Sequence, residues 1–123
     1  MKRRLLLAGI VSAGLPFFVM NIGMAIDVDI TGQYKCKGKN VDGSTYDGTA
    51  NITKKGSVYY VKWSVGKQNF NGIGILQGNV LAVSYYGNFS GVAAYRIESS
   101  SRLVGRWTTR RQGTTLNTET LTR

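Results

Sequence analysis

The side chains that most often carry out catalysis are scarce in this sequence. Its 123 residues include no histidine, one cysteine (Cys36) and six acidic residues. Without histidine, Ser-His-Asp and Cys-His sites cannot form, and a histidine-ligated metal site is excluded. A single cysteine also excludes an intramolecular disulfide and a thiolate zinc cluster. We therefore expect a non-enzymatic protein that uses no metal and no cofactor.

The remaining reactive groups do not suggest an alternative catalytic site. Cys36 alternates with Lys35 and Lys37, so the two lysines point away from it on a strand and cannot activate the thiol. A small buried thiol is the simpler interpretation. Among the carboxylates, Asp42 and Asp47 lie in or near a turn, whereas Glu98 and Glu119 stand alone in the sequence. No pair suited to glycoside hydrolysis is evident.

Positive charge offers the clearest binding chemistry. The chain carries 16 Lys and Arg, and its net charge is +10. Six of these cations alternate along two segments: Lys35, Lys37, Lys39, Arg102, Arg106 and Arg110. On strands, each row would lie on one outward face. We predict that they bind an anionic glycan, an envelope polymer or an extracellular protein. Solubility and protection of sheet edges are the alternative explanation.

Aromatic residues define a second candidate site. The side chains with the opposite, inward parity include Tyr34, Tyr46, Tyr59, Trp63 and Trp107. A small barrel either fills its interior with such rings or holds one small ligand there. The second function considered is thus a carrier of a small apolar ligand. Buried tyrosine hydroxyls need hydrogen-bond partners, for which Glu119, Thr118 and Arg96 are candidates.

The elements that position these residues are strands throughout. Apolar and polar residues alternate with short turn sequences between the runs. The expected strands cover residues 30–37, 46–53, 59–65, 68–75, 80–86, 92–98, 102–109 and 114–121. This pattern predicts an all-β fold, an eight-stranded antiparallel up-and-down meander that closes into a small barrel, with an open β-sandwich as the alternative. Closure would place the last strand between the two cationic rows, about 10 Å apart.

Glycines recur inside the expected strands, two residues after an apolar or aromatic residue. They are Gly32, Gly48, Gly72 and Gly105. A glycine within a strand is typical of a bend at a barrel corner. Close approach of a ligand to the backbone is the alternative.

The first 25 residues have the layout of a secretory signal peptide. Three cations (Lys2, Arg3 and Arg4) precede an apolar run over residues 5–20, and small residues end the segment at Ala25. We predict a helical signal peptide over residues 1–25, cleavage after Ala25 and a single barrel domain over 26–123. The run is shorter than the roughly 20 residues that span a bilayer, although an uncleaved anchor is the alternative. Cleavage would remove those three cations and no acid, which lowers the net charge from +10 to +7.

Export would place the protein in the periplasm, at the cell surface or outside the cell, without a transmembrane anchor after processing. That location disfavours nucleic acid as the partner. A compact barrel with short loops also fits an exported inhibitor of a hydrolase, the third function considered.

Several motifs resemble a known family. Residues 30–34 read Ile-Thr-Gly-Gln-Tyr, and 42–50 read Asp-Gly-Ser-Thr-Tyr-Asp-Gly-Thr-Ala. With the Leu-Val-Gly-Arg-Trp of 103–107 and the Thr-Glu-Thr-Leu-Thr of 118–122, they resemble small exported bacterial β-barrel proteins usually labelled fibronectin-binding-protein-like or uncharacterised. This resemblance implies an adhesin-like role in surface recognition. More loosely, the Thr-Gly-Gln-Tyr of 31–34 is similar to the first strand of avidin-like barrels, with Tyr where they have Trp.

Overall fold

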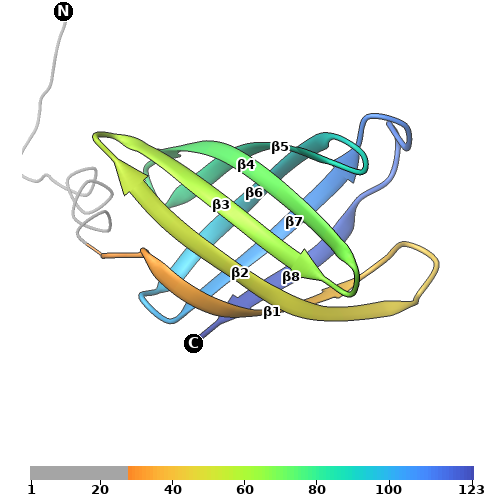
Figure 1. Cartoon of the computed structure of the whole chain (residues 1–123), viewed down its shortest axis with the longest axis horizontal. Helices are drawn as coiled ribbons and strands as arrows, with labels where there is room; N and C mark the ends of the chain where they lie inside the picture. The colour runs from red at the N-terminus through yellow and green to blue at the C-terminus, as the bar shows by residue number, and fades with distance from the viewer. Residues whose placement is uncertain (1–27) are drawn as a thin grey trace, which may run out of the picture.

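Eight antiparallel strands close into a barrel in the computed structural model, which describes residues 28–123 (Figure 1). The strands are β1 (Gly32–Lys39), β2 (Thr45–Lys55), β3 (Val58–Val65), β4 (Gln68–Gln77), β5 (Val80–Gly87), β6 (Gly91–Ser99), β7 (Arg102–Thr109) and β8 (Asn117–Thr122). The predicted fold class is confirmed, and the open sandwich is not what forms. The signal peptide and its cleavage fall on residues 1–27, outside the described part. No helix in that part is long and apolar enough to cross a membrane.

Each strand pairs with its neighbour in the sequence, and β8 closes the barrel against β1. Lys39 lies opposite Thr118 across this seam, and Thr118 lies opposite Arg106 of β7. Tight turns join β2 to β3, β3 to β4 and β4 to β5. Each turn contains a glycine with φ near +60°, namely Gly56, Gly66 and Gly78. This left-handed conformation suits glycine because it lacks a Cβ.

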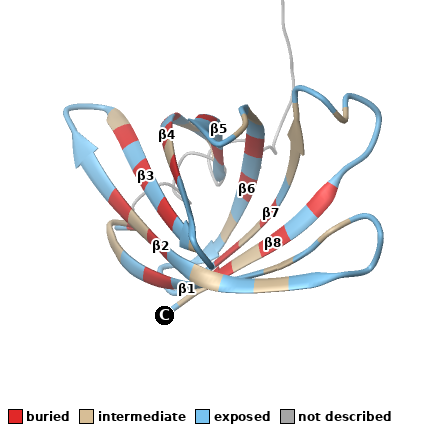
Figure 2. Ribbon diagram, turned by 45° about the vertical axis from the view of Figure 1, so that its right-hand side comes forward, coloured by how far each residue is buried: buried red, intermediate tan, exposed pale blue. Residues whose placement is uncertain are grey.

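Buried and exposed residues alternate along the strands, as the parity predicts (Figure 2). The inward side chains form one continuous apolar core, which includes Cys36 at 1% exposure. Only two polar residues are buried within the described part, Asn117 at 1% exposure and Glu119 at 6%. Both lie on β8 and both are hydrogen-bonded, as buried polar groups must be.

The last strand is shorter than the sequence predicts, since β8 begins at Asn117 and not at residue 114. The reason is the buried Asn117 side chain. Its amide donates to Gln112 Oε1 over 2.9 Å, while its Oδ1 accepts the Val41 amide over 3.0 Å. These bonds hold residues 110–116 in a loop and tie that loop to the one between β1 and β2. Strand β1 is displaced by two residues, to Gly32–Lys39 from the predicted 30–37.

One end of the barrel is closed by side chains. Tyr34 lies inside and donates from its hydroxyl to the Ile30 carbonyl over 2.8 Å. Arg123 covers this end, with its guanidinium 4.7 Å from the centre of the Tyr34 ring. Arg123 also donates to the backbone carbonyls of Thr31, Ser100 and Asp29. The C-terminus and the first described residues therefore meet at this closed end (Figure 1).

Candidate functional site: an aromatic cavity at the open end of the barrel

The opposite end of the barrel contains a cavity of about 280 Å³ that opens to solvent. Seven aromatic side chains from six strands and one loop line it: Tyr46, Trp63, Phe70, Tyr85, Phe89, Tyr95 and Trp107. The other lining residues are Asn40, Val65, Gln68, Ala93 and Glu119. Cavities for drug-sized ligands span about 300–1,000 Å³, so this one suits a small ligand.

Among the described residues, Glu119 is the only charged one that lines the cavity. Its Oε1 accepts a 2.7 Å hydrogen bond from the Tyr46 hydroxyl. Its Oε2 accepts bonds from the Tyr95 hydroxyl and, over 3.1 Å, from Trp63 Nε1. Both oxygens act as acceptors, which is the pattern of an ionised carboxylate. A negative charge thus lies within the lumen, and no lysine or arginine of residues 28–123 lines the cavity to balance it.

The network extends one residue further towards the opening. Trp107 Nε1 donates to the Tyr46 hydroxyl over 2.8 Å, so Tyr46 both accepts and donates. Five strands therefore contribute to one polar cluster: β2, β3, β6, β7 and β8. We call Tyr46, Trp63, Tyr95, Trp107 and Glu119 the Glu119 network.

Two glycines make room for this network. Gly38 of β1 and Gly105 of β7 lie directly opposite Glu119 on either side of β8. A Cβ at Gly38 would overlap the Tyr46 ring, and one at Gly105 would overlap the Tyr95 ring. Each glycine is also the cross-strand partner of the tyrosine that covers it. The missing side chains allow both rings to lie against the barrel wall with their hydroxyls at Glu119.

The aromatic rings contact one another edge to face. Tyr85 lies at the centre, 6.0 Å from Trp63, 6.0 Å from Phe70 and 6.2 Å from Trp107 between ring centres, with interplanar angles of 68–86°. Phe89, from the loop between β5 and β6, packs on Phe70 at 4.8 Å. Such geometry is favourable for ring quadrupoles and holds each ring in place. The wall of the cavity is therefore formed by rings that support one another.

Burial and the nearby Glu119 charge keep the lumen hydroxyls and the thiol protonated. Burial is the larger cause and Glu119 the second, and together they raise the pKa of Tyr46 and Tyr95 well above the usual 10. The pKa of Tyr85 rises to about 12 for the same two reasons. The pKa of the Cys36 thiol is also raised, mainly by burial. The tyrosines remain hydrogen-bond donors at neutral pH, and Cys36 is not a nucleophile there.

The structure divides the five predicted lumen residues into two groups. Tyr46, Trp63 and Trp107 line the cavity. Tyr34 and Tyr59 also point inward, at 1% and 6% exposure, but they fill the closed half. Of the three residues predicted as hydrogen-bond partners of the tyrosine hydroxyls, Glu119 accepts bonds from Tyr46 and Tyr95. Thr118 and Arg96 are exposed on the outer face. Phe70, Tyr85, Phe89 and Tyr95 were not predicted as site residues. Two of them share a feature that predicts a ring inside the barrel, namely a tyrosine paired across strands with a glycine. The pairs are Tyr95–Gly105 and Tyr85–Gly91.

All six predicted wall cations are exposed, and β8 lies between their two strands as closure requires. Lys35–Thr122–Arg102 and Lys39–Thr118–Arg106 are in register across the three strands. We call Lys35, Lys37, Lys39, Arg102, Arg106 and Arg110 the basic wall. Arg110 lies just beyond the end of β7.

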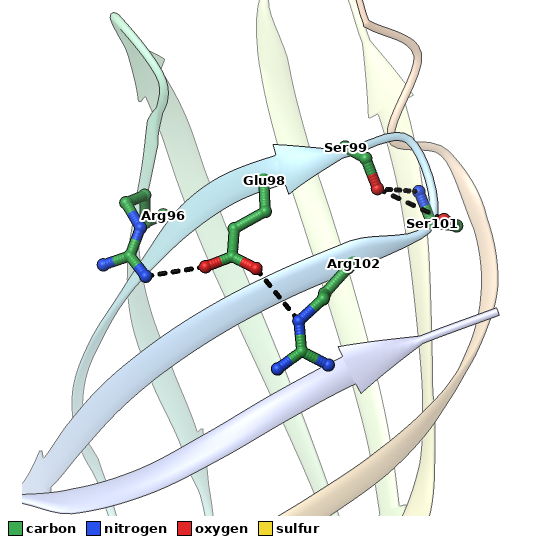
Figure 3. A network of polar contacts seen from close by, with 5 residues as sticks. All are labelled: Arg96, Glu98, Ser99, Ser101 and Arg102. Atoms are coloured by element: carbon green, nitrogen blue, oxygen red, sulfur yellow. Dashed lines mark hydrogen bonds and ion pairs between the residues drawn. The ribbon is translucent and has the colours of Figure 1, made fainter.

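Two members of the basic wall are paired with acids. Arg102 Nε lies 2.9 Å from Glu98, which also binds Arg96 (Figure 3). Lys37 lies 3.7 Å from Asp47. Among the described residues, Lys35, Lys39, Arg106 and Arg110 form no ion pair. These four therefore carry the uncompensated charge of the wall.

The outer face over β4 and β5 differs sharply from the basic wall. No acidic or basic residue occurs from Gln68 to Tyr95, which covers β4, β5 and half of β6. Ile73, Ile75 and Val92 are about half exposed on this face. Charge is thus segregated on the barrel, and its outer face over β4 and β5 is apolar.

Comparisons with known proteins support the fold. No family model matches the chain, and no curated protein matches its sequence. A redesigned β-barrel is similar in structure, with a TM-score of 0.68 at 17% identity over 76% of this chain and 90% of that one. The redesigned barrel mFAP1 bound to DFHBI gives a TM-score of 0.65 at 15% identity, over 76% of this chain and 94% of that one. The REP1-NXSQ fatty acid transporter gives 0.54 at 11% identity, over 77% of this chain and 96% of that one. At these identities the likeness shows a shared small-barrel fold.

Proposed function

We propose that this protein binds a small ring-containing ligand in the open half of its lumen. The observation that carries the proposal is the cavity of about 280 Å³, open at one end and lined by seven aromatic rings. Engineered apolar cavities of about 150 Å³ bind benzene, so this space suits one or two rings. One similar barrel is a redesigned protein bound to DFHBI and another is a fatty acid transporter, which agrees with small-ligand binding in this architecture.

The same cavity favours binding over catalysis. Glu119 is the only charged residue in its lining within the described part of the chain, and both carboxylate oxygens already accept hydrogen bonds from the protein. We propose that the protein is not an enzyme and that it acts after export, as the N-terminal sequence predicts. In that setting the barrel would carry or sequester its ligand outside the cytoplasm.

Tryptophan fluorescence provides a direct test. The chain contains two tryptophans, Trp63 and Trp107, and both line the cavity. Any ligand in the lumen should therefore change the emission of the whole protein. We expect small aromatic compounds to quench or shift this emission in a saturable manner, with a 1:1 stoichiometry by calorimetry.

A pair of neighbouring alanines supplies matched variants. Ala93 lines the cavity, whereas Ala94 on the same strand is exposed on the outer face. Ala93→Leu should fill part of the cavity and weaken binding at least tenfold, while Ala94→Leu should leave the affinity unchanged. Equal affinity of both variants for every ligand found would contradict binding in the lumen.

The basic wall supports a second candidate function, recognition of an anionic glycan, envelope polymer or extracellular protein. The observation that favours it is the register of Lys39 and Arg106 on either side of Thr118. Lys39→Glu with Arg106→Glu should reduce retention on a heparin column. Lys55→Glu with Lys62→Glu is the control, because both lysines are exposed on β2 and β3 and the change in net charge is the same. Equal loss of retention in both variants would show a response to net charge alone and refute the basic wall as a site.

A further inference from the structure

We infer that the ligand of the lumen is a small organic cation, and that a quaternary ammonium group fits it best. This inference rests on the proposed function, because it specifies the chemistry of a ligand bound in the same cavity. It differs from the apolar ligand that the aromatic residues alone suggest.

The first argument is the charge of the cavity. Glu119 is 6% exposed and is the only charged lining residue that the structure describes. A neutral ligand would displace water from around a carboxylate and supply no counter-charge. An anionic ligand, such as a fatty acid, would place a second negative charge beside the first without a lining cation to balance it. A cationic ligand compensates the charge already there.

The second argument is the nature of the wall. Cations bind favourably near the faces of tryptophan, tyrosine and phenylalanine rings, and desolvation strengthens this interaction. Seven such rings line the cavity together with Glu119. Tyr85 and its neighbours are fixed by edge-to-face contacts, so the wall is formed before a ligand enters. Preformed aromatic walls of this kind suit quaternary ammonium groups.

The third argument concerns hydrogen bonds. The two oxygens of Glu119 together accept three bonds, from Tyr46, Tyr95 and Trp63. A primary ammonium group needs three acceptors, and a buried one with unmade bonds is costly. A quaternary ammonium group needs none, and Glu119 can attract it through charge alone. The satisfied carboxylate therefore favours recognition by charge and shape.

Cations near the opening do not cancel this attraction. Lys39 and Lys67 directly precede the lining residues Asn40 and Gln68, and both lysines are exposed. At physiological ionic strength, charges in water are screened within about 8 Å. The charge of Glu119 is buried and is screened much less. The affinity for a cation should therefore change little between low and physiological salt.

Three probes of similar shape and different charge test the inference on the unmodified protein. Phenyltrimethylammonium is positive, tert-butylbenzene is neutral and benzenesulfonate is negative, and each carries a tetrahedral group on one ring. Binding is followed by tryptophan emission and calorimetry. We expect the cation to bind about tenfold more tightly than the neutral probe, and the sulfonate not to bind. Equal or tighter binding of the neutral probe or the sulfonate would overturn the inference and uphold the proposed function. Failure of all three probes to bind would overturn both.

Two glutamate variants locate the effect. Glu119→Gln removes the charge of the lumen, and Glu98→Gln removes an exposed charge on β6. Glu119→Gln should abolish the tenfold preference for the cation by weakening cation binding alone, whereas Glu98→Gln should retain the preference. A preference that survives in folded Glu119→Gln protein would overturn the assignment of Glu119. Should that variant fail to fold, the three-probe comparison still decides the question.

Discussion

Replacing Tyr95 with phenylalanine tests the Glu119 network at its most buried bond. Tyr95 is 1% exposed, and its hydroxyl donates to Glu119 Oε2. Phenylalanine keeps the ring and deletes only the hydroxyl. A hydrogen bond to a charged group contributes about 1.5–3 kcal/mol. We therefore expect the free energy of unfolding to fall by about 2 kcal/mol at pH 7, which lowers Tm by roughly 8–16 °C for a domain of this size.

The same variant makes a second prediction about pH. Burial and the Glu119 charge raise the pKa of Tyr95 well above 10, so above pH 10 the unfolded chain loses this proton and the folded barrel retains it. Wild-type stability therefore decreases as pH rises through 10. At pH 11 the Tyr95 contribution to this loss is about 1.4 kcal/mol. Tyr95→Phe lacks this contribution, so the stability gap between the two proteins should narrow from about 2 to about 0.6 kcal/mol.

Urea unfolding followed by tryptophan fluorescence and circular dichroism measures both quantities. Tyr86→Phe is the matched control, because Tyr86 is 60% exposed on the outer face. That variant should stay within about 0.5 kcal/mol of wild type at both pH values. A Tyr95→Phe effect below about 0.5 kcal/mol at pH 7, or a gap that does not narrow at pH 11, would refute the buried charged network.

Three further predictions test other parts of the barrel. Gly38→Ala should displace the Tyr46 ring, because a Cβ at this position overlaps it. The free energy of unfolding should fall by about 1–3 kcal/mol, and the tryptophan emission should change. Unchanged emission would argue against the close contact. Arg123→Ala should lower the free energy of unfolding by about 0.5–1.5 kcal/mol, because it removes the hydrogen bonds to the exposed carbonyls of Thr31, Ser100 and Asp29. Arg123→Lys should not restore this stability, because one ammonium group lacks the planar fork; full rescue by lysine would contradict this geometry. Cys36 is 1% exposed and its pKa is raised, so iodoacetamide should not modify the thiol at pH 8 until urea unfolds the barrel. Rapid modification of the native protein would show that the barrel opens near β1.

Most of the fold could be predicted from the sequence because the alternation of apolar and polar residues along a strand is a local pattern. Alternation along residues such as Tyr59, Val61 and Trp63 places each side chain on one face without any knowledge of its partner. The start of β8 could not be predicted in this way. Thr114 and Thr115 favour a strand, and the loop depends on Asn117 contacts with Gln112 and with Val41, 76 residues away in the sequence. A bond of that range has no local signature.

The candidate site shows the same limit. The alternation along each strand predicts that Tyr46, Trp63 and Trp107 point into the barrel, but it does not predict which half of the lumen they occupy. That distinction follows from strand direction and register, which place Tyr34 at the closed end and Tyr46 at the open one. The recurring glycines were expected to bend the strands. At Gly105 the structure shows space for the neighbouring Tyr95 ring, a role that becomes visible only when the cross-strand pair is known.

The hollow half of the lumen is a consequence of its polar network. A chain this short has few apolar side chains to spare, which favours a lumen filled completely by its tyrosine and tryptophan rings. Glu119 prevents this by holding the hydroxyls of Tyr46 and Tyr95 at the wall, and the glycines opposite it let those rings lie flat there. In the closed half, Tyr34 has no such partner; it bonds to the backbone of Ile30 and packs within the core. The buried charge of Glu119 therefore keeps the cavity open at a cost in stability, and a ligand that compensates this charge would recover part of that cost.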